Sequence, residues 1–175
     1  FDVIVGNPPY QLKDGGAQSS ATPVYQHFVE QAKKLKPNYI CMITPSRWFS
    51  GGKGLDEFRN SMLKDLSIRQ IHDYPDASEC FPNVEIKGGV NYFVWNRERQ
   101  GNCLVCTYKK NNLISKMERP LQEENTDIFI RYNEAISIFR KVRKINENSF
   151  SDLISPRKPF GLATNYKANK SKSDN

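Results

Sequence analysis

The stretch Asn7-Pro8-Pro9-Tyr10 places an amide, two prolines and an aromatic ring directly after the short apolar run of residues 1–5. Two prolines in a row cannot continue a strand or a helix, so the chain must turn away there. The amide oxygen can accept hydrogen bonds, and the prolines hold carbonyl groups rigidly without N–H groups that need partners. The tyrosine adds a flat face for stacking. These residue types predict a site for a planar group that donates hydrogen bonds.

The segments around this stretch predict how it is positioned. Residues 1–5 are typical of a buried strand, and Thr22 and Pro23 favour the start of a helix that ends by residue 37, with Thr22 as N-cap. A second apolar run, residues 39–44, stops at a proline. A strand, a helix and a strand in this order are typical of a parallel βαβ unit. Ligands bind at the carboxyl ends of such strands, which is where the amide and the prolines fall.

The alternation continues along the chain. Apolar spacing predicts a helix over 55–66, strands over 68–74 and 90–95, an antiparallel edge strand over 101–108, and a late helix over 135–145. The pattern predicts an α/β fold with a doubly wound, mostly parallel sheet.

The chain has a net charge of +7, and it is unevenly distributed. Residues 1–139 hold 17 basic and 16 acidic side chains, whereas residues 140–175 hold 9 and 3. A basic terminal segment favours a polyanion as partner, although the last seven residues are also typical of a solvated tail.

The four cysteines do not follow the spacing of a secreted disulfide framework. Cys103 and Cys106 have half the spacing of a zinc ribbon, but no second pair follows, so we expect no metal. No apolar run reaches the length of a membrane span. We therefore expect a cytoplasmic protein with no membrane partner.

The run of residues 1–6 followed by Asn-Pro-Pro-Tyr resembles the catalytic signature of the N6-adenine DNA methyltransferases. Residues 44–49, 88–95 and 156–161 resemble segments of the large methyltransferases of restriction-modification systems. The resemblance covers residues 1 to about 100 and, more loosely, 150–167.

This resemblance implies that the chain is the C-terminal half of a Rossmann-like methyltransferase sheet. Residues 1–110 would be the catalytic half, 111–150 a helical connection, and 151–175 the start of a basic DNA-recognition region or a tail. It also implies S-adenosylmethionine as cofactor and double-stranded DNA as partner, with a possible nuclease or specificity module elsewhere in the protein. The family's glycine-rich cofactor loop precedes the tetrapeptide and is not found here, so only Asn7 would touch the cofactor. We expect the chain alone to be inactive.

For adenine the chemistry of the tetrapeptide can be stated physically. The exocyclic amino group is a poor nucleophile because its lone pair is delocalised into the ring. The side-chain oxygen of Asn7 and a carbonyl held by Pro8 and Pro9 can accept its two hydrogens and free that lone pair. The ring of Tyr10 can stack on the base, which must leave the duplex to be reached. These four residues are the predicted catalytic residues.

Other residues are predicted to bind base or phosphate. The family places an aromatic residue against the base near Tyr92 and Phe93, and we favour Phe93, although the two point to opposite faces of a strand. Arg47, Arg157 and Lys158 are predicted DNA-binding residues, with a surface ion pair an equally good reading of Arg47.

Two other function classes share these features. Enzymes that methylate glutamine side chains of release factors, and some RNA methyltransferases, carry the same tetrapeptide. A non-catalytic DNA-binding fragment could also keep it as structure. The later family segments and the basic C-terminal region favour DNA methylation.

Overall fold

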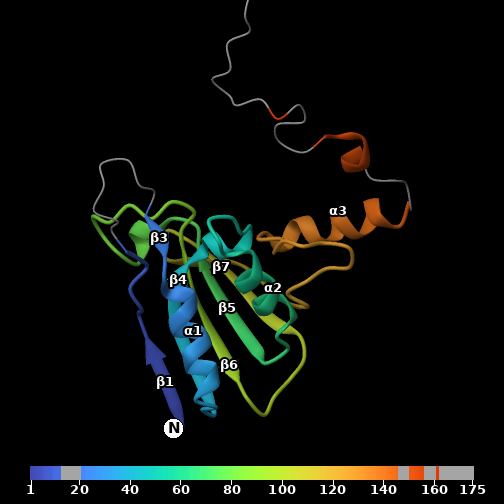
Figure 1. Cartoon of the computed structure of the whole chain (residues 1–175). Helices are drawn as coiled ribbons and strands as arrows, with labels where there is room; N and C mark the ends of the chain where they lie inside the picture. Colours follow the sequence, from blue (N-terminus) through green and yellow to red (C-terminus); the bar gives the residue numbers. More distant parts are fainter. Residues whose placement is uncertain (13–20, 146–149, 156–160, 162–175) are drawn as a thin grey trace, which may run out of the picture. The chain divides into compact units, whose positions relative to one another are not determined.

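The computed structural model describes residues 1–12, 21–145, 150–155 and 161. The chain divides into two compact units, Phe1–Ser137 and Ile138–Asn175. The first unit contains a six-stranded sheet in the order β1-β4-β6-β5-β7-β8 (Figure 1). Its strands are β1 (Val3–Gly6), β4 (Tyr39–Pro45), β5 (Ile68–Tyr74), β6 (Val90–Asn96), β7 (Cys103–Lys109) and β8 (Asn112–Arg119).

Four of these strands run in the same direction. β1 pairs in parallel with β4, and β5 with β7, while β6 lies between β4 and β5 and is antiparallel to both. β8 is antiparallel to β7 at the edge of the sheet. The prediction of a mostly parallel α/β sheet with an antiparallel edge strand is confirmed.

The identity of the edge strand differs from the prediction. The segment predicted as the antiparallel edge is β7, which is an inner strand parallel to β5. The edge is β8, because Lys110 and Asn111 both have positive φ and form a two-residue turn that pairs Lys109 with Asn112. The sheet therefore continues beyond the predicted boundary at residue 110, and residues 112–119 are a strand rather than part of a helical connection.

The helices α1 (Tyr25–Lys34) and α2 (Asp56–Lys64) both cover one face of the sheet (Figure 1). The core lies between them and the sheet, and it is closed by the 3-10 helix η1 (Ser46–Phe49). Its fully buried members include Val29, Trp48, Leu55, Met62, Ile40, Ile71, Phe93 and Val105. On the other face of the sheet the aromatic side chains are only half-buried, and two pairs stack, His72 on Tyr92 and Tyr74 on Tyr108, with ring centroids 4.4 and 4.7 Å apart.

The first helix begins later than predicted. Thr22 and Pro23 do not start α1 but form β3 (Thr22–Pro23), which pairs with β2 (Gln11–Leu12). The helix starts at Tyr25 without a capping side chain at residue 24. Instead, the side-chain amide of Gln26 donates to the carbonyl of Pro23 at 3.0 Å, which ties the helix to the hairpin.

The late helix is confirmed as α3 (Asn133–Arg143), which spans the division between the units. In the second unit, Ile138, Val142 and Ile145 are exposed, and a short 3-10 helix η3 (Phe150–Leu153) follows.

Candidate active site

The Asn-Pro-Pro-Tyr stretch lies at the carboxyl end of β1, as predicted. Gly6, the last residue of the strand, pairs with Met42 of the neighbouring β4, and the chain then leaves the sheet. Asn7 is exposed, whereas Pro8 is buried and anchors the loop. Among the described residues, no hydrogen bond within the chain reaches the carbonyl oxygens of Pro8 or Pro9. The loop therefore presents an amide side chain and uncommitted carbonyl groups at a strand end.

Tyr10 is half-buried and forms the transition from this loop to the core. Its ring is nearly perpendicular to the rings of Tyr25 and Phe81, with centroids 6.5 and 6.2 Å away. Its hydroxyl group is buried without a hydrogen-bond partner. Burial, reinforced by Cys80, raises the pKa of Tyr10 to about 12. Like an ordinary tyrosine, Tyr10 is neutral near pH 7, and it offers a ring rather than a charge.

A cavity of about 400 Å³, here called the first cavity, opens beside Tyr10. Its walls come from the β2–β3 hairpin, the start of α1, the end of β4 and the loop before β6. The lining residues are Tyr10, Gln11, Ala21, Pro23, Tyr25, Pro45, Arg47, Lys53, Val84, Glu85, Ile86 and Lys87. Three cations against one carboxylate make this lining net positive, and its tyrosine, proline and aliphatic side chains add apolar surface beside the charges. It suits a flat, uncharged group carried on an anionic chain.

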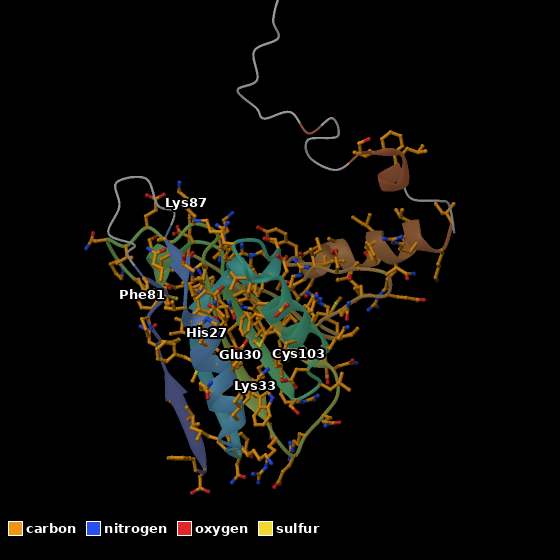
Figure 2. All side chains as sticks on the ribbon, in the orientation of Figure 1. His27, Glu30, Lys33, Phe81, Lys87 and Cys103 are labelled. Atoms are coloured by element: carbon orange, nitrogen blue, oxygen red, sulfur yellow. The ribbon has the colours of Figure 1, made fainter. Side chains whose placement is uncertain are left out.

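The cations of this lining, Arg47, Lys53 and Lys87, are here called the cationic rim. Arg47 follows β4 in η1, Lys53 has positive φ in the turn before α2, and Lys87 lies in the loop before β6. All three are exposed, and none forms an ion pair within the part of the chain that the structure describes. Figure 2 shows Lys87 at the same end of the molecule as Phe81, whereas His27, Glu30 and Lys33 follow one another down α1.

The structure does not agree with the stacking role predicted for Phe93. Its side chain has no exposed surface, because β6 turns it toward the helix-covered face of the sheet. A ring without an exposed face cannot receive a base. Its neighbour Tyr92 points to the opposite face, where it stacks on His72. Neither residue lines the first cavity.

Of the three residues predicted to bind DNA, Arg47 lines the first cavity, whereas Arg157 and Lys158 lie outside the described residues. Tyr25, Phe81, Lys53 and Lys87 were not predicted. Tyr25 falls within the helix predicted between Thr22 and residue 37, and the other three lie in loops without any periodic signal.

No group of three or more His, Cys, Asp and Glu side chains that could hold a metal ion occurs within the described ranges. Cys103 and Cys106 are separate, buried thiols. Across the same ranges, every helix is too short or too polar to span a membrane.

Comparison with known proteins gives matches of two kinds. Residues 1–81 match the family model described as Eco57I restriction-modification methylase. A protein of Mycoplasma pneumoniae described as an uncharacterized adenine-specific methylase is 35% identical over 145 residues, which are 81% of this chain and 34% of that protein. The chain thus spans about a third of the length of this curated relative. The predicted resemblance to adenine-specific methylases of restriction-modification systems is confirmed.

Solved structures give weaker likenesses. The chain is 14% identical to a type I restriction-modification methyltransferase subunit from Streptococcus thermophilus, with a TM-score of 0.42 over 85% of this chain and 33% of that one. It is 14% identical to a chain of the DrdV–DNA complex, with a TM-score of 0.49 over 74% of this chain and 18% of that one.

Proposed function

We propose that the protein carrying this chain, a relative of the restriction-modification methylases, transfers a methyl group from S-adenosylmethionine to the N6 amino group of an adenine in double-stranded DNA. The observation that carries the proposal is the position of residues 7–10. They leave the carboxyl end of β1 with acceptor groups that no hydrogen bond from the described residues occupies, and Tyr10 lines a cavity edged by the cationic rim. The match of residues 1–81 to a methylase family supports it.

Asn7 and the two prolines would act as paired acceptors. The side-chain oxygen of Asn7 takes one hydrogen of the amino group, and a carbonyl of Pro8 or Pro9 takes the other. The carbonyl acceptor is fixed before the base arrives, because Pro8 is buried and proline restricts the backbone. Such preorganised dipoles stabilise the nitrogen as it becomes pyramidal and gains charge, without a catalytic base.

At the end of β1, Asn7 and the prolines would present the amino nitrogen for methylation. When bound, S-adenosylmethionine would supply a methyl group on a sulfonium: the new C–N bond would replace the C–S bond, whose electrons would stay on sulfur, and the nitrogen would lose a proton to water. The exposed amide of Asn7 fits a position between base and donor. The chain spans about a third of the length of its curated relative, so we propose that residues outside this chain complete the donor site.

Tyr10 would hold the base once it has left the duplex. Stacking on an aromatic ring contributes roughly 1–3 kcal/mol per base. Tyr10 is uncharged near pH 7, as an ordinary tyrosine is, so its ring can stack on the base without placing a negative charge beside the cationic rim. The rim would hold the phosphates on either side of the extruded nucleotide.

The setting of the activity is part of the proposal. A nuclease or specificity module would share the protein or its complex, and the enzyme would work in the cytoplasm. The four free cysteines suit a reducing compartment.

The test is methyl transfer by the full-length protein from labelled S-adenosylmethionine to DNA, with the product base identified by mass. Asn7→Ala should lower kcat on the order of 10²–10³-fold with little change in KM, as expected when one preorganised transition-state contact is removed. N6-methyladenine as the product, lost in Asn7→Ala, supports the proposal. Label on a protein glutamine or on RNA, or full DNA methylation by Asn7→Ala, would overturn it.

A further inference from the structure

A row of buried polar side chains crosses the sheet at its carboxyl end, next to the first cavity. Thr44 of β4, Asn91 of β6, Asp73 of β5 and Thr107 of β7 are register neighbours, and each is at most 1% exposed. They lie on the helix-covered face of the sheet. The core residues Ile71 and Phe93 lie on the same face, two positions along the strand from Asp73 and Asn91 respectively. Polar groups in this position need partners, because burying them unpaired is costly.

Hydrogen bonds link this row to η1. The side-chain amide of Asn91 donates to the carbonyl of Thr44 and to the hydroxyl of Ser46, both at 3.3 Å. The hydroxyl of Ser46 donates to Asp73 at 2.9 Å. The carboxylate of Asp73 is thereby held in one orientation by the sheet beneath it.

Asp73 in turn fixes Arg131. Nε and Nη2 of Arg131 donate to the two carboxylate oxygens of Asp73 at 2.6 and 2.8 Å. The Asp73 side chain is completely buried, whereas that of Arg131 is 22% exposed. The guanidinium also lies over the ring of Phe49, 5.6 Å from its centroid. A buried ion pair adds little net stability, so what this arrangement achieves is a rigid arginine.

The guanidinium keeps donors for a ligand. Five N–H bonds point outward in its plane, and Asp73 uses one on Nε and one on Nη2. Nη1 has no hydrogen bond within the described part of the chain. The remaining edge, Nη1 with the second hydrogen of Nη2, is the fork that binds phosphate through two parallel hydrogen bonds.

Arg131 lines a second cavity, of about 370 Å³, on the other side of the cationic rim. Its lining is Ser46, Arg47, Phe49, Ser50, Lys87, Gly88, Phe129 and Arg131. Arg47 and Lys87 line both cavities, so they stand between them. The second cavity has three cationic side chains in its lining and no acidic one.

We propose that the second cavity binds the backbone phosphate next to the nucleotide held in the first cavity, with Arg131 as the residue that orients it. The proposal rests on the proposed function for the identity of the nucleic acid. A phosphodiester chain fits better than a free anion, because the shared cations join a cavity lined by the rings of Tyr10 and Tyr25 to a cavity whose charged lining residues are all cationic. Arg131 acts through Asp73, Ser46 and Asn91, which are positioning residues.

The test is equilibrium binding of a short DNA duplex to the full-length protein at several salt concentrations, without methyl donor. Each lost phosphate contact lowers the slope of log K against log[salt] by about 0.9. Lys87→Gln and Arg47→Gln should each show that loss. Lys34→Gln removes the same charge from the exposed last turn of α1, which shares no lining with either cavity, and should keep the slope of the natural protein.

Arg131→Lys tests the orientation of the phosphate by the guanidinium fork separately from the positive charge that attracts it. It keeps a cation beside Asp73 and so avoids an unpaired buried carboxylate, but it loses the fork. We expect an affinity about 5–10-fold weaker, an unchanged salt slope, and a Tm close to that of the natural protein. Asp73→Asn should reproduce the weaker affinity, because the fork loses its fixed orientation.

Unchanged slopes for Lys87→Gln and Arg47→Gln, or unchanged affinity for Arg131→Lys, would refute the inference. Inorganic phosphate at constant ionic strength serves as a competitor, and displacement of DNA at millimolar phosphate would assign the cavity to the free anion instead. Because no methyl donor is present, these results are independent of the product analysis. If the slopes do not change but N6-methyladenine is still formed, this inference fails together with the phosphate-binding role of the rim, and the proposed reaction stands. If the slopes change but no methylation occurs, the proposed reaction fails and this inference stands.

Discussion

The two faces of the sheet differ in how tightly they hold aromatic side chains. On the helix-covered face, Phe93 is fully buried in a single core with Trp48 and Phe58. On the opposite face, His72 and Tyr92 stack on each other but stay partly exposed, since no described helix covers them. Residues adjacent in sequence, Tyr92 and Phe93, therefore belong to different environments. The covered face fixes the fold, whereas loops at the strand ends carry the candidate site.

Phe93→Ala tests the covered face and should have the largest effect. Removing a fully buried phenylalanine costs about 3–5 kcal/mol of unfolding free energy. Tyr92→Ala is the matched control on the opposite face, here called the open face. It should cost less than half as much unfolding free energy, because the side chain is only partly buried. Urea unfolding of both variants measures the difference. Equal losses would mean that the open face is packed as tightly as the covered one.

Gly89→Ala and Gly88→Ala test how closely the start of β6 approaches β5 at the strand end. Both glycines have positive φ, +80° and +90°, but a Cβ at Gly89 would lie 2.2 Å from the carbonyl oxygen of Tyr74, and one at Gly88 meets nothing within 4 Å. Gly88→Ala should cost about 1–2 kcal/mol for the backbone conformation alone. Gly89→Ala should cost clearly more, measured by thermal unfolding, since the start of β6 must shift. A milder effect at Gly89 than at Gly88 would contradict the close approach.

His72 gives the open face a pH dependence. Burial, and secondarily Lys116, lowers the pKa of His72, whose ring also contacts Tyr92, Tyr108 and Gln70. Because the folded pKa lies below the unfolded one, the unfolded state binds the proton first as the pH falls below about 6.5. The stability contributed by neutral His72 is complete above that pH and declines below it. His72→Gln should therefore lose less stability between pH 7 and 5 than the natural protein, as measured by Tm; parallel curves would rule this out.

Tyr10→Phe should have the smallest effect. It removes a buried hydroxyl without a partner and keeps the ring, so unfolding free energy should stay the same or rise slightly. DNA methylation should be retained, whereas Tyr10→Ala should weaken capture of the base. The rates of the two variants, measured side by side, separate the ring from the hydroxyl. A large rate loss in Tyr10→Phe would give the hydroxyl a role that the structure does not show.

The sequence predicted most of what is local and periodic. The strand before Asn7, the position of residues 7–10 at its carboxyl end, and the main helices and strands up to residue 96 could be read from apolar spacing and prolines. The predicted burial of the first strand was wrong, because β1 lies at the edge of the sheet and Val3 and Val5 are exposed. The start of α1 could not, because Thr22 and Pro23 pair with a segment ten residues earlier. Rules for helix capping consider only residues that are adjacent in sequence, so they cannot predict such pairing.

The candidate site was predicted only in its catalytic loop. The choice between Tyr92 and Phe93 depended on which face of the sheet the helices cover, and an aromatic pair carries no information on that. Lys87 and Arg131 meet Arg47 only through the fold, from loops whose composition shows no pattern. The link from Asn91 to Arg131 was likewise invisible, because its members come from three strands, a 3-10 helix and a late loop.

The antiparallel strand β6 has a consequence for the order in which the chain can fold. β4 and β5 follow each other along the chain, yet neither pairs with the other, because β6 enters between them only after both have been made. In the finished sheet β4 and β5 lie two strand spacings apart, roughly 10 Å, and β6 fills the space between them. The β1–β4 pair therefore joins β5, β7 and β8 through Val90–Asn96. Because β5 pairs with β6 and β7, both of which follow it in the chain, we expect β5 to lack a strand partner until this segment has been made.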